Sequence, residues 1–66
     1  MSRKVVFVRN FNYRPDWKSE ERQIKEGVEG QVISTIGQSE EWFRVEVVGE
    51  PTMVEARLAV DIREVP

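Results

Sequence analysis

The chain has 66 residues, a net charge of −2 and neither cysteine nor histidine. We expect one domain over residues 1–66 with a thin core, because a chain of this size buries only about 60% of its unfolded surface. Without cysteine or histidine the chain has no disulfide, no thiolate zinc site and no ordinary nucleophile–base pair, so we expect no enzyme activity, no catalytic residue, no metal site and no cofactor.

The first predicted strand runs from about Arg3 to Arg9. Its centre, Val5–Val8, is apolar on both faces, which is typical of a strand in a central or closed sheet. Residues 10–25 follow without clean periodicity, and we interpret them as a long loop or a flattened hairpin. Loops of this length in small domains are usually functional.

Glycines and an alternating segment define the middle of the chain. Gly27 and Gly30 predict a turn or bulge at the entrance to a strand over residues 31–36, because glycine permits positive φ or close backbone approach. A polar turn over residues 37–41 leads to a strand over residues 42–48. The alternation in that strand places three side chains on the core face, namely Phe43, Val45 and Val47.

The segment after the turn at residues 49–51 is ambiguous. Thr52–Glu55 matches a helix capping box, and apolar residues up to Val65 also fall at helical spacing. The same residues alternate as a strand. We favour a strand over residues 53–58, a turn over 59–61 and a last strand over 62–65, which completes an all-β, five-stranded small barrel. The alternative is an α+β fold with a three-stranded sheet and a C-terminal helix.

The order of these features resembles an SH3 domain along nearly the whole chain. Arg9–Tyr13 matches the A-L-Y-D-Y-type segment, and the long loop after it matches the RT loop. Ile24–Gly27 matches the hydrophobic-x-x-Gly pattern, and Trp42–Phe43 matches the Trp–aromatic pair of the third strand. The resemblance implies a five-stranded SH3-like barrel with a long first loop. The proline and tyrosine that peptide-binding SH3 domains use near their 3₁₀ turn are replaced by Leu58–Ile62, so recognition of proline-rich peptides is not expected.

Two narrower resemblances concern parts of the chain. Residues 43–62 are similar in pattern to the C-terminal half of type II dihydrofolate reductases. The Val-Gln-Ile-Tyr segment of that family corresponds to Val54–Arg57, which lacks the glutamine and the tyrosine and so argues against the activity. The first 27 residues resemble small uncharacterised phage and prophage proteins that begin R-F-x-x-D-F-D-Y-x-P, with asparagine at two aspartate positions. This resemblance implies a phage or prophage origin and no particular activity.

Aromatic side chains point to a binding face. We assign Phe11 and Phe43 to the core, whereas Trp42 points to the opposite face beside Arg44. Interfaces favour tryptophan, tyrosine and arginine, so we predict a protein- or peptide-binding module. In the alternative interpretation, the long loop folds over Trp42 and buries it against Tyr13 or Trp17. The predicted binding residues are Tyr13, Arg14, Trp17, Lys18, Trp42 and Arg44.

Charge is unevenly distributed along the chain. Residues 1–18 carry a net charge of +4 and residues 19–66 a net charge of −6. Either the fold mixes these charges, or a basic N-terminal patch faces an acidic partner. Two alternative functions are a self-associating structural protein and weak nucleic-acid association through the basic third, although the overall negative charge disfavours nucleic acid.

The location of the protein is also an expectation from the sequence. The apolar run Val5–Val8 is too short for a membrane helix or a signal peptide. The absence of cysteine fits a reducing compartment. We therefore expect a cytoplasmic protein without a membrane partner.

Overall fold

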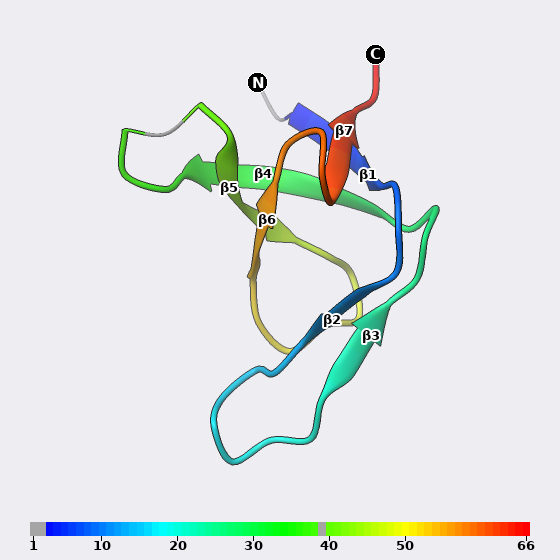
Figure 1. The fold of residues 1–66 in the computed structure, drawn as a ribbon, viewed down its shortest axis with the longest axis vertical. Helices are drawn as coiled ribbons and strands as arrows, with labels where there is room; N and C mark the ends of the chain where they lie inside the picture. Colours follow the sequence, from blue (N-terminus) through cyan, green and yellow to red (C-terminus); the bar gives the residue numbers. More distant parts are fainter. Residues whose placement is uncertain (1–2, 39) are drawn as a thin grey trace.

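The computed structural model describes residues 3–38 and 40–66, which form seven strands and no helix (Figure 1). The strands are β1 (Arg3–Phe7), β2 (Phe11–Tyr13), β3 (Arg22–Ile24), β4 (Glu29–Thr35), β5 (Trp42–Glu46), β6 (Val54–Arg57) and β7 (Ile62–Glu64). The fold is therefore all-β. Across the described part of the chain, no helix long and apolar enough to cross a membrane is found.

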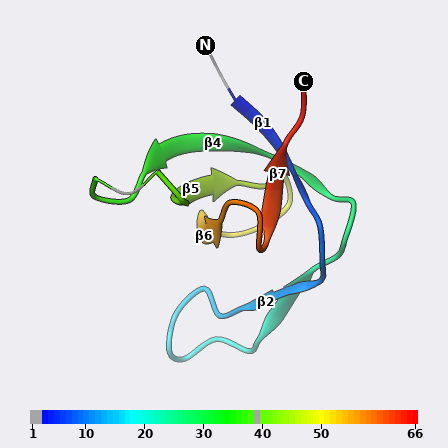
Figure 2. The same ribbon diagram turned by 45° about the horizontal axis from the view of Figure 1, so that its top comes forward.

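Five strands form one antiparallel sheet in the order β6-β5-β4-β1-β7, and β2 and β3 form a separate hairpin. The sheet curls into a half-barrel, with β4 arching over β5 and β6 in Figure 2. A curled sheet of five antiparallel strands is compatible with the expected SH3-like barrel. The C-terminal helix considered as an alternative is wrong, because β6 pairs with β5 over its whole length, from Trp42↔Arg57 to Val45↔Val54.

Gly30 explains how β4 and β5 approach closely. A Cβ atom on Gly30 would lie 2.6 Å from Val45 Cγ1 and 3.0 Å from the Glu46 carbonyl oxygen. Gly27 has a φ of 92°, a left-handed conformation that L side chains rarely adopt. Gly27 thus provides the predicted positive φ, and Gly30 provides the predicted close backbone approach. Strand β4 begins at Glu29, two residues before the expected start at residue 31.

The core lies on the concave face of the sheet. The alternation over residues 42–48 correctly predicted Phe43, Val45 and Val47 as buried, although β5 itself ends at Glu46. Phe11, which we assigned to the core, is only half-buried and packs against the edge of the core. It lies on the hairpin that covers the open side of the half-barrel. The buried apolar residues are Val5, Phe7, Ile24, Phe43, Val45, Val47, Val54, Ala56 and Ile62.

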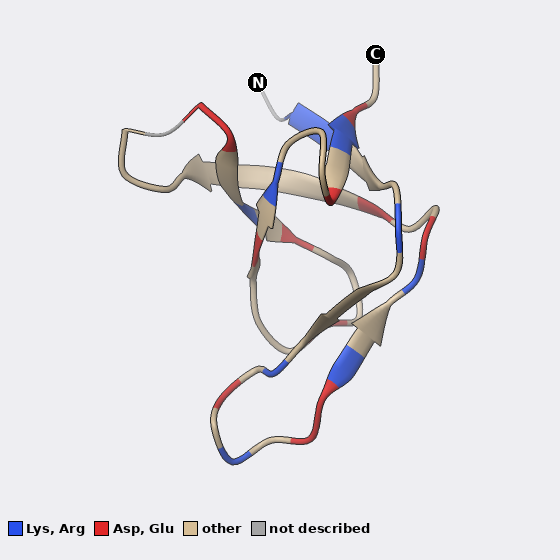
Figure 3. Ribbon diagram, in the orientation of Figure 1, with Lys and Arg blue, Asp and Glu red and all other residues tan. Residues whose placement is uncertain are grey.

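The sheet brings the basic N-terminal strand against the acidic C-terminal part of the chain. Arg3 forms an ion pair with Glu64, and Arg9 Nη2 lies 2.5 Å from Asp61 Oδ1. These contacts follow from the pairing of β1 with β7, which places Phe7 opposite Ile62. Figure 3 shows cations and acids interspersed over the fold. This arrangement favours mixed charges over a continuous basic patch.

Candidate functional site

A groove of about 440 Å³ lies between the chain around β2 and the chain around β6. We call it the β2–β6 groove. Half-buried Phe11 and Tyr13 and buried Val54 make its lining partly apolar, and two arginines add positive charge to it. Its lining residues are Phe11, Tyr13, Arg14, Pro15, Arg44, Thr52, Met53, Val54 and Glu55.

A hydrogen-bonded cluster holds the hairpin against the β5–β6 loop. The Tyr13 hydroxyl donates to Glu50 Oε1 at 2.5 Å, and Arg22 Nε donates to the same oxygen at 3.1 Å. The Tyr13 hydrogen bond, followed by that of Arg22, lowers the pKa of Glu50 below its ordinary value. Burial, followed by the neighbouring Glu50, raises the pKa of Tyr13. The cluster fixes one wall of the groove relative to the other.

Trp17 lies at the tip of the hairpin, on a turn that is stabilised by its own hydrogen bonds. The Lys18 amide donates to Asp16 Oδ1 at 2.7 Å, and the Ser19 amide donates to the Asp16 carbonyl at 3.1 Å. Arg14 Nη1 donates to the Ser19 carbonyl at 2.9 Å. Trp17 remains 84% exposed, with Lys18 Nζ 5.0 Å from its ring centroid. The turn therefore presents a large aromatic ring to solvent.

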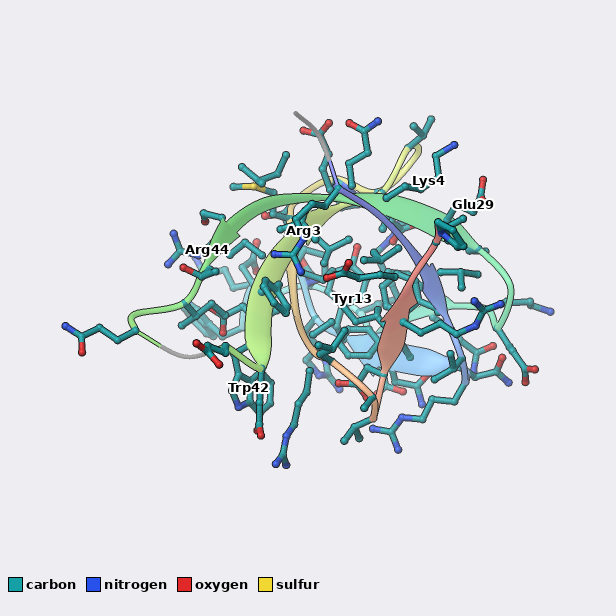
Figure 4. All side chains as sticks on the ribbon, turned by 90° about the horizontal axis from the view of Figure 1, so that it is seen from above. Arg3, Lys4, Tyr13, Glu29, Trp42 and Arg44 are labelled. Carbon is teal, nitrogen blue, oxygen red and sulfur yellow. The ribbon has the colours of Figure 1, made fainter. Side chains whose placement is uncertain are left out.

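Trp42 lies outside the groove lining. It is 41% exposed, and the Arg57 guanidinium lies 6.0 Å from its ring centroid. Figure 4 shows Tyr13 toward the middle of the molecule and Trp42 at the periphery. Since Trp17 is 84% exposed and Trp42 41% exposed, the long loop does not bury these two rings against each other.

The six predicted binding residues thus divide into three groups. Tyr13, Arg14 and Arg44 line the β2–β6 groove. Trp17 and Lys18 lie on the turn that follows Pro15, itself a groove residue. Trp42 shares the outer face of β5 with Arg44, two residues along the strand.

Sequence reasoning missed the other half of the groove. Thr52, Met53 and Glu55 were not singled out, because the same segment also matched a helix and its exposed face was undefined. Glu50 was missed as well, since no local pattern indicates that it meets Tyr13, which lies 37 residues away in the chain. Their positions depend on how the hairpin packs on the sheet.

A second hollow of about 590 Å³ adjoins the groove, and the two share Pro15 and Thr52. It carries three acidic residues, Asp16, Glu20 and Glu21. Over residues 3–38 and 40–66, no group of three or more acidic side chains is placed to hold a metal ion. The two hollows therefore differ in net charge, because two arginines and Glu55 line the groove, whereas three acidic residues and Arg22 line the second hollow.

Comparisons with known proteins found no counterpart for this arrangement. No family model matches the chain, and neither the curated proteins nor the solved structures contain a significant match. The groove and the Trp17 turn are therefore the features from which a function is inferred.

Proposed function

We propose that this protein is a non-enzymatic binding module that docks a protein or peptide partner on the β2–β6 groove and Trp17. The observation that carries the proposal is the exposure of Trp17, 84%, on a turn ordered by three hydrogen bonds. Because the backbone of this turn is ordered before binding, docking on Trp17 costs little backbone entropy. Tryptophans are among the residues that dominate binding energy at protein interfaces.

The groove supplies the surroundings that such an anchor needs. Phe11 and Tyr13 offer half-buried aromatic surface, and Met53 is 44% exposed. Arg14 and Arg44 add charged donors at its rim. Aromatic residues, methionine and arginine are the types enriched in protein interfaces. The acid–base chemistry of the groove is limited, because the Tyr13 hydroxyl is already engaged by Glu50.

The biological setting is also a proposal. The resemblance of the first 27 residues to small phage and prophage proteins supports a phage or prophage origin and a site of action in the cytoplasm. Genomic neighbours test this part. Flanking phage genes would support it, and a conserved non-phage operon would contradict it.

A peptide selection tests the binding function. The immobilised protein would be exposed to a displayed library of random 12-residue peptides, and enriched sequences measured by fluorescence polarisation. We expect Trp17→Ala to weaken their binding about 30-fold, as expected for an interface hot spot of about 2 kcal/mol. Val48→Ala is the matched control, since Val48 is 98% exposed and lies outside the groove.

Two outcomes would contradict the proposed function. One is a selection that enriches no peptide sequence. The other is a set of peptides that bind Trp17→Ala and the unaltered protein equally. Circular dichroism should show the same fold for both variants, because an exposed side chain contributes little to stability.

A further inference from the structure

Both walls of the β2–β6 groove are formed beside strand edges. β6 is the last strand of the five-stranded sheet, and β2 pairs only with β3 in the described chain. Four consecutive residues of one wall, 52–55, face four residues of the other, 11 and 13–15. The groove is therefore a gap in the barrel with the edge of a sheet on one side.

The backbone groups of β6 that face this gap follow from the register. Leu58 donates its amide to the Glu41 carbonyl at 2.7 Å, so Leu58, and by alternation Ala56, pair with β5 through hydrogen bonds. Glu55 and Arg57 occupy the alternate positions of β6, so their amides and carbonyls point away from β5. The Arg57 amide agrees with this assignment, because it donates to Asp61 Oδ2 at 3.0 Å on the side of β6 away from β5.

The edge of β6 is thus closed at one end and open at the other. Asp61, which is buried, blocks the Arg57 position with its carboxylate. Glu55 is a lining residue of the groove, and the register places its amide and carbonyl on the side of β6 away from β5. An unpaired strand edge beside a groove is the feature on which extended peptides add as extra strands.

We propose that an extended peptide binds as an added strand along β6 within the β2–β6 groove, pairing with the backbone of Glu55. This inference rests on the proposed function and specifies how the partner binds. Of the lining over residues 52–55, only Val54 and Glu55 belong to β6, so the peptide pairs with β6 over about two residues, or ~7 Å of strand. Alternate side chains of the peptide face the apolar lining of Phe11, Tyr13 and Val54.

The charges of the groove specify the remaining side chains of the peptide. Arg14 donates to a backbone carbonyl, and Arg44 Nε lies 3.9 Å from Glu55 Oε2, with both side chains more than half exposed. Two arginines against one carboxylate leave the groove positively charged. Acidic side chains alternating with apolar ones complement it.

A folded second copy does not fit this gap as a partner. In a second copy, β6 is paired with β5, so the whole sheet of that copy would have to enter the space beside the β2–β3 hairpin. The Asp61 contact also shortens the available edge to the Glu55 end. A single extended segment meets neither obstacle.

The test uses the labelled peptide Val-Glu-Val-Glu-Val and two substitutions at one position. Glu55→Pro removes the outward amide without touching the hydrogen bonds to β5, and proline is tolerated on strand edges. We expect Glu55→Pro to weaken binding of the peptide about five- to tenfold, the effect of one lost backbone hydrogen bond. Glu55→Gln keeps the backbone amide and removes a negative charge, so this variant should bind the peptide at least as tightly as the unaltered protein does. A Val-Lys-Val-Lys-Val peptide should bind more weakly.

Amide hydrogen exchange gives a second readout on the unaltered protein, independent of whether Glu55→Pro folds. Saturating peptide should slow exchange at the Glu55 amide, while the Ala56 amide, already bonded to β5, changes little. If library-selected peptides bind while Glu55 exchange is unchanged, strand addition is wrong and the binding function stands. Equal binding of the lysine peptide would overturn the acidic preference. If light scattering shows a dimer with Glu55 protected in the absence of peptide, a second copy occupies the edge instead.

Discussion

Replacing Tyr13 by phenylalanine removes the hydroxyl that fastens the hairpin to the β5–β6 loop and leaves the ring in place. The lost hydrogen bond, 2.5 Å long, is made to a Glu50 side chain that is 15% exposed. Hydrogen bonds to charged groups contribute about 1.5–3 kcal/mol, and partial exposure reduces this. We therefore expect a loss of about 1–2 kcal/mol at neutral pH, a large share of the stability of so small a domain.

The penalty should depend on pH in a defined direction. The hydrogen bond from Tyr13, with that from Arg22, lowers the folded-state pKa of Glu50. A lowered pKa means that the carboxylate stabilises the fold fully above the unfolded glutamate value, about 4.3, and loses this effect as pH falls through the lower folded value. The difference between Tyr13→Phe and the unaltered protein should therefore be full at pH 7 and shrink below about pH 4.

Urea unfolding followed by tryptophan fluorescence measures this difference. The four proteins needed are the unaltered chain, Tyr13→Phe, Glu50→Gln and the double variant, each at pH 7, 5 and 3.5. Glu50→Gln should abolish the acid-dependent part of the difference. A Tyr13→Phe penalty below about 0.5 kcal/mol at pH 7, the range of neutral surface substitutions, would refute the reasoning, as would a penalty equal at pH 7 and 3.5.

Four further substitutions test other parts of the structure. Gly30→Ala should destabilise the protein by about 1–3 kcal/mol in urea, because its Cβ would overlap β5, and a neutral or stabilising result would contradict the close approach. Asp61→Ala leaves the Arg57 amide without its carboxylate and should cost about 1–3 kcal/mol in thermal unfolding; an unchanged melting temperature would argue against the contact. Trp42→Ala should keep the fold, as measured by circular dichroism, because the Trp42 side chain is 41% exposed; unfolding of this variant would place the Trp42 ring in the core. Phe43→Ala, by contrast, should lower the free energy of unfolding by about 3–5 kcal/mol, because Phe43 is buried.

Local patterns predicted the elements that alternate or contain glycine. The buried face of β5 followed from a period of two, which needs no knowledge of neighbouring strands. Gly30 marked a close approach, although the partner atoms on Val45 and Glu46 could not be identified from the chain. The segment 52–58 stayed ambiguous because a capping box and a strand pattern coincide there, and pairing with β5 resolved it.

The candidate site was predictable only in part, for a physical reason. Tyr13, Arg14 and Arg44 were identified by residue type, which reflects the chemistry that interfaces use. Their assembly with Met53 and Glu55 required the hairpin to fold across the open side of the half-barrel. Contacts between residues this far apart in the chain arise from the packing of whole elements and leave no local signature.

Local periodicity, which depends on near neighbours in the chain, determined the buried face of β5, and composition showed that cysteine and histidine are absent. The sequence favoured the all-β class, and the pairing of β6 with β5 decided it. The tertiary structure decided the rest. It separated Trp42 from the groove, joined Tyr13 to Glu50 and left the Glu55 edge of β6 facing a gap. These features are set by the order of the strands and by the position of the hairpin, because backbone edges and long-range ion pairs exist only once distant segments have packed together.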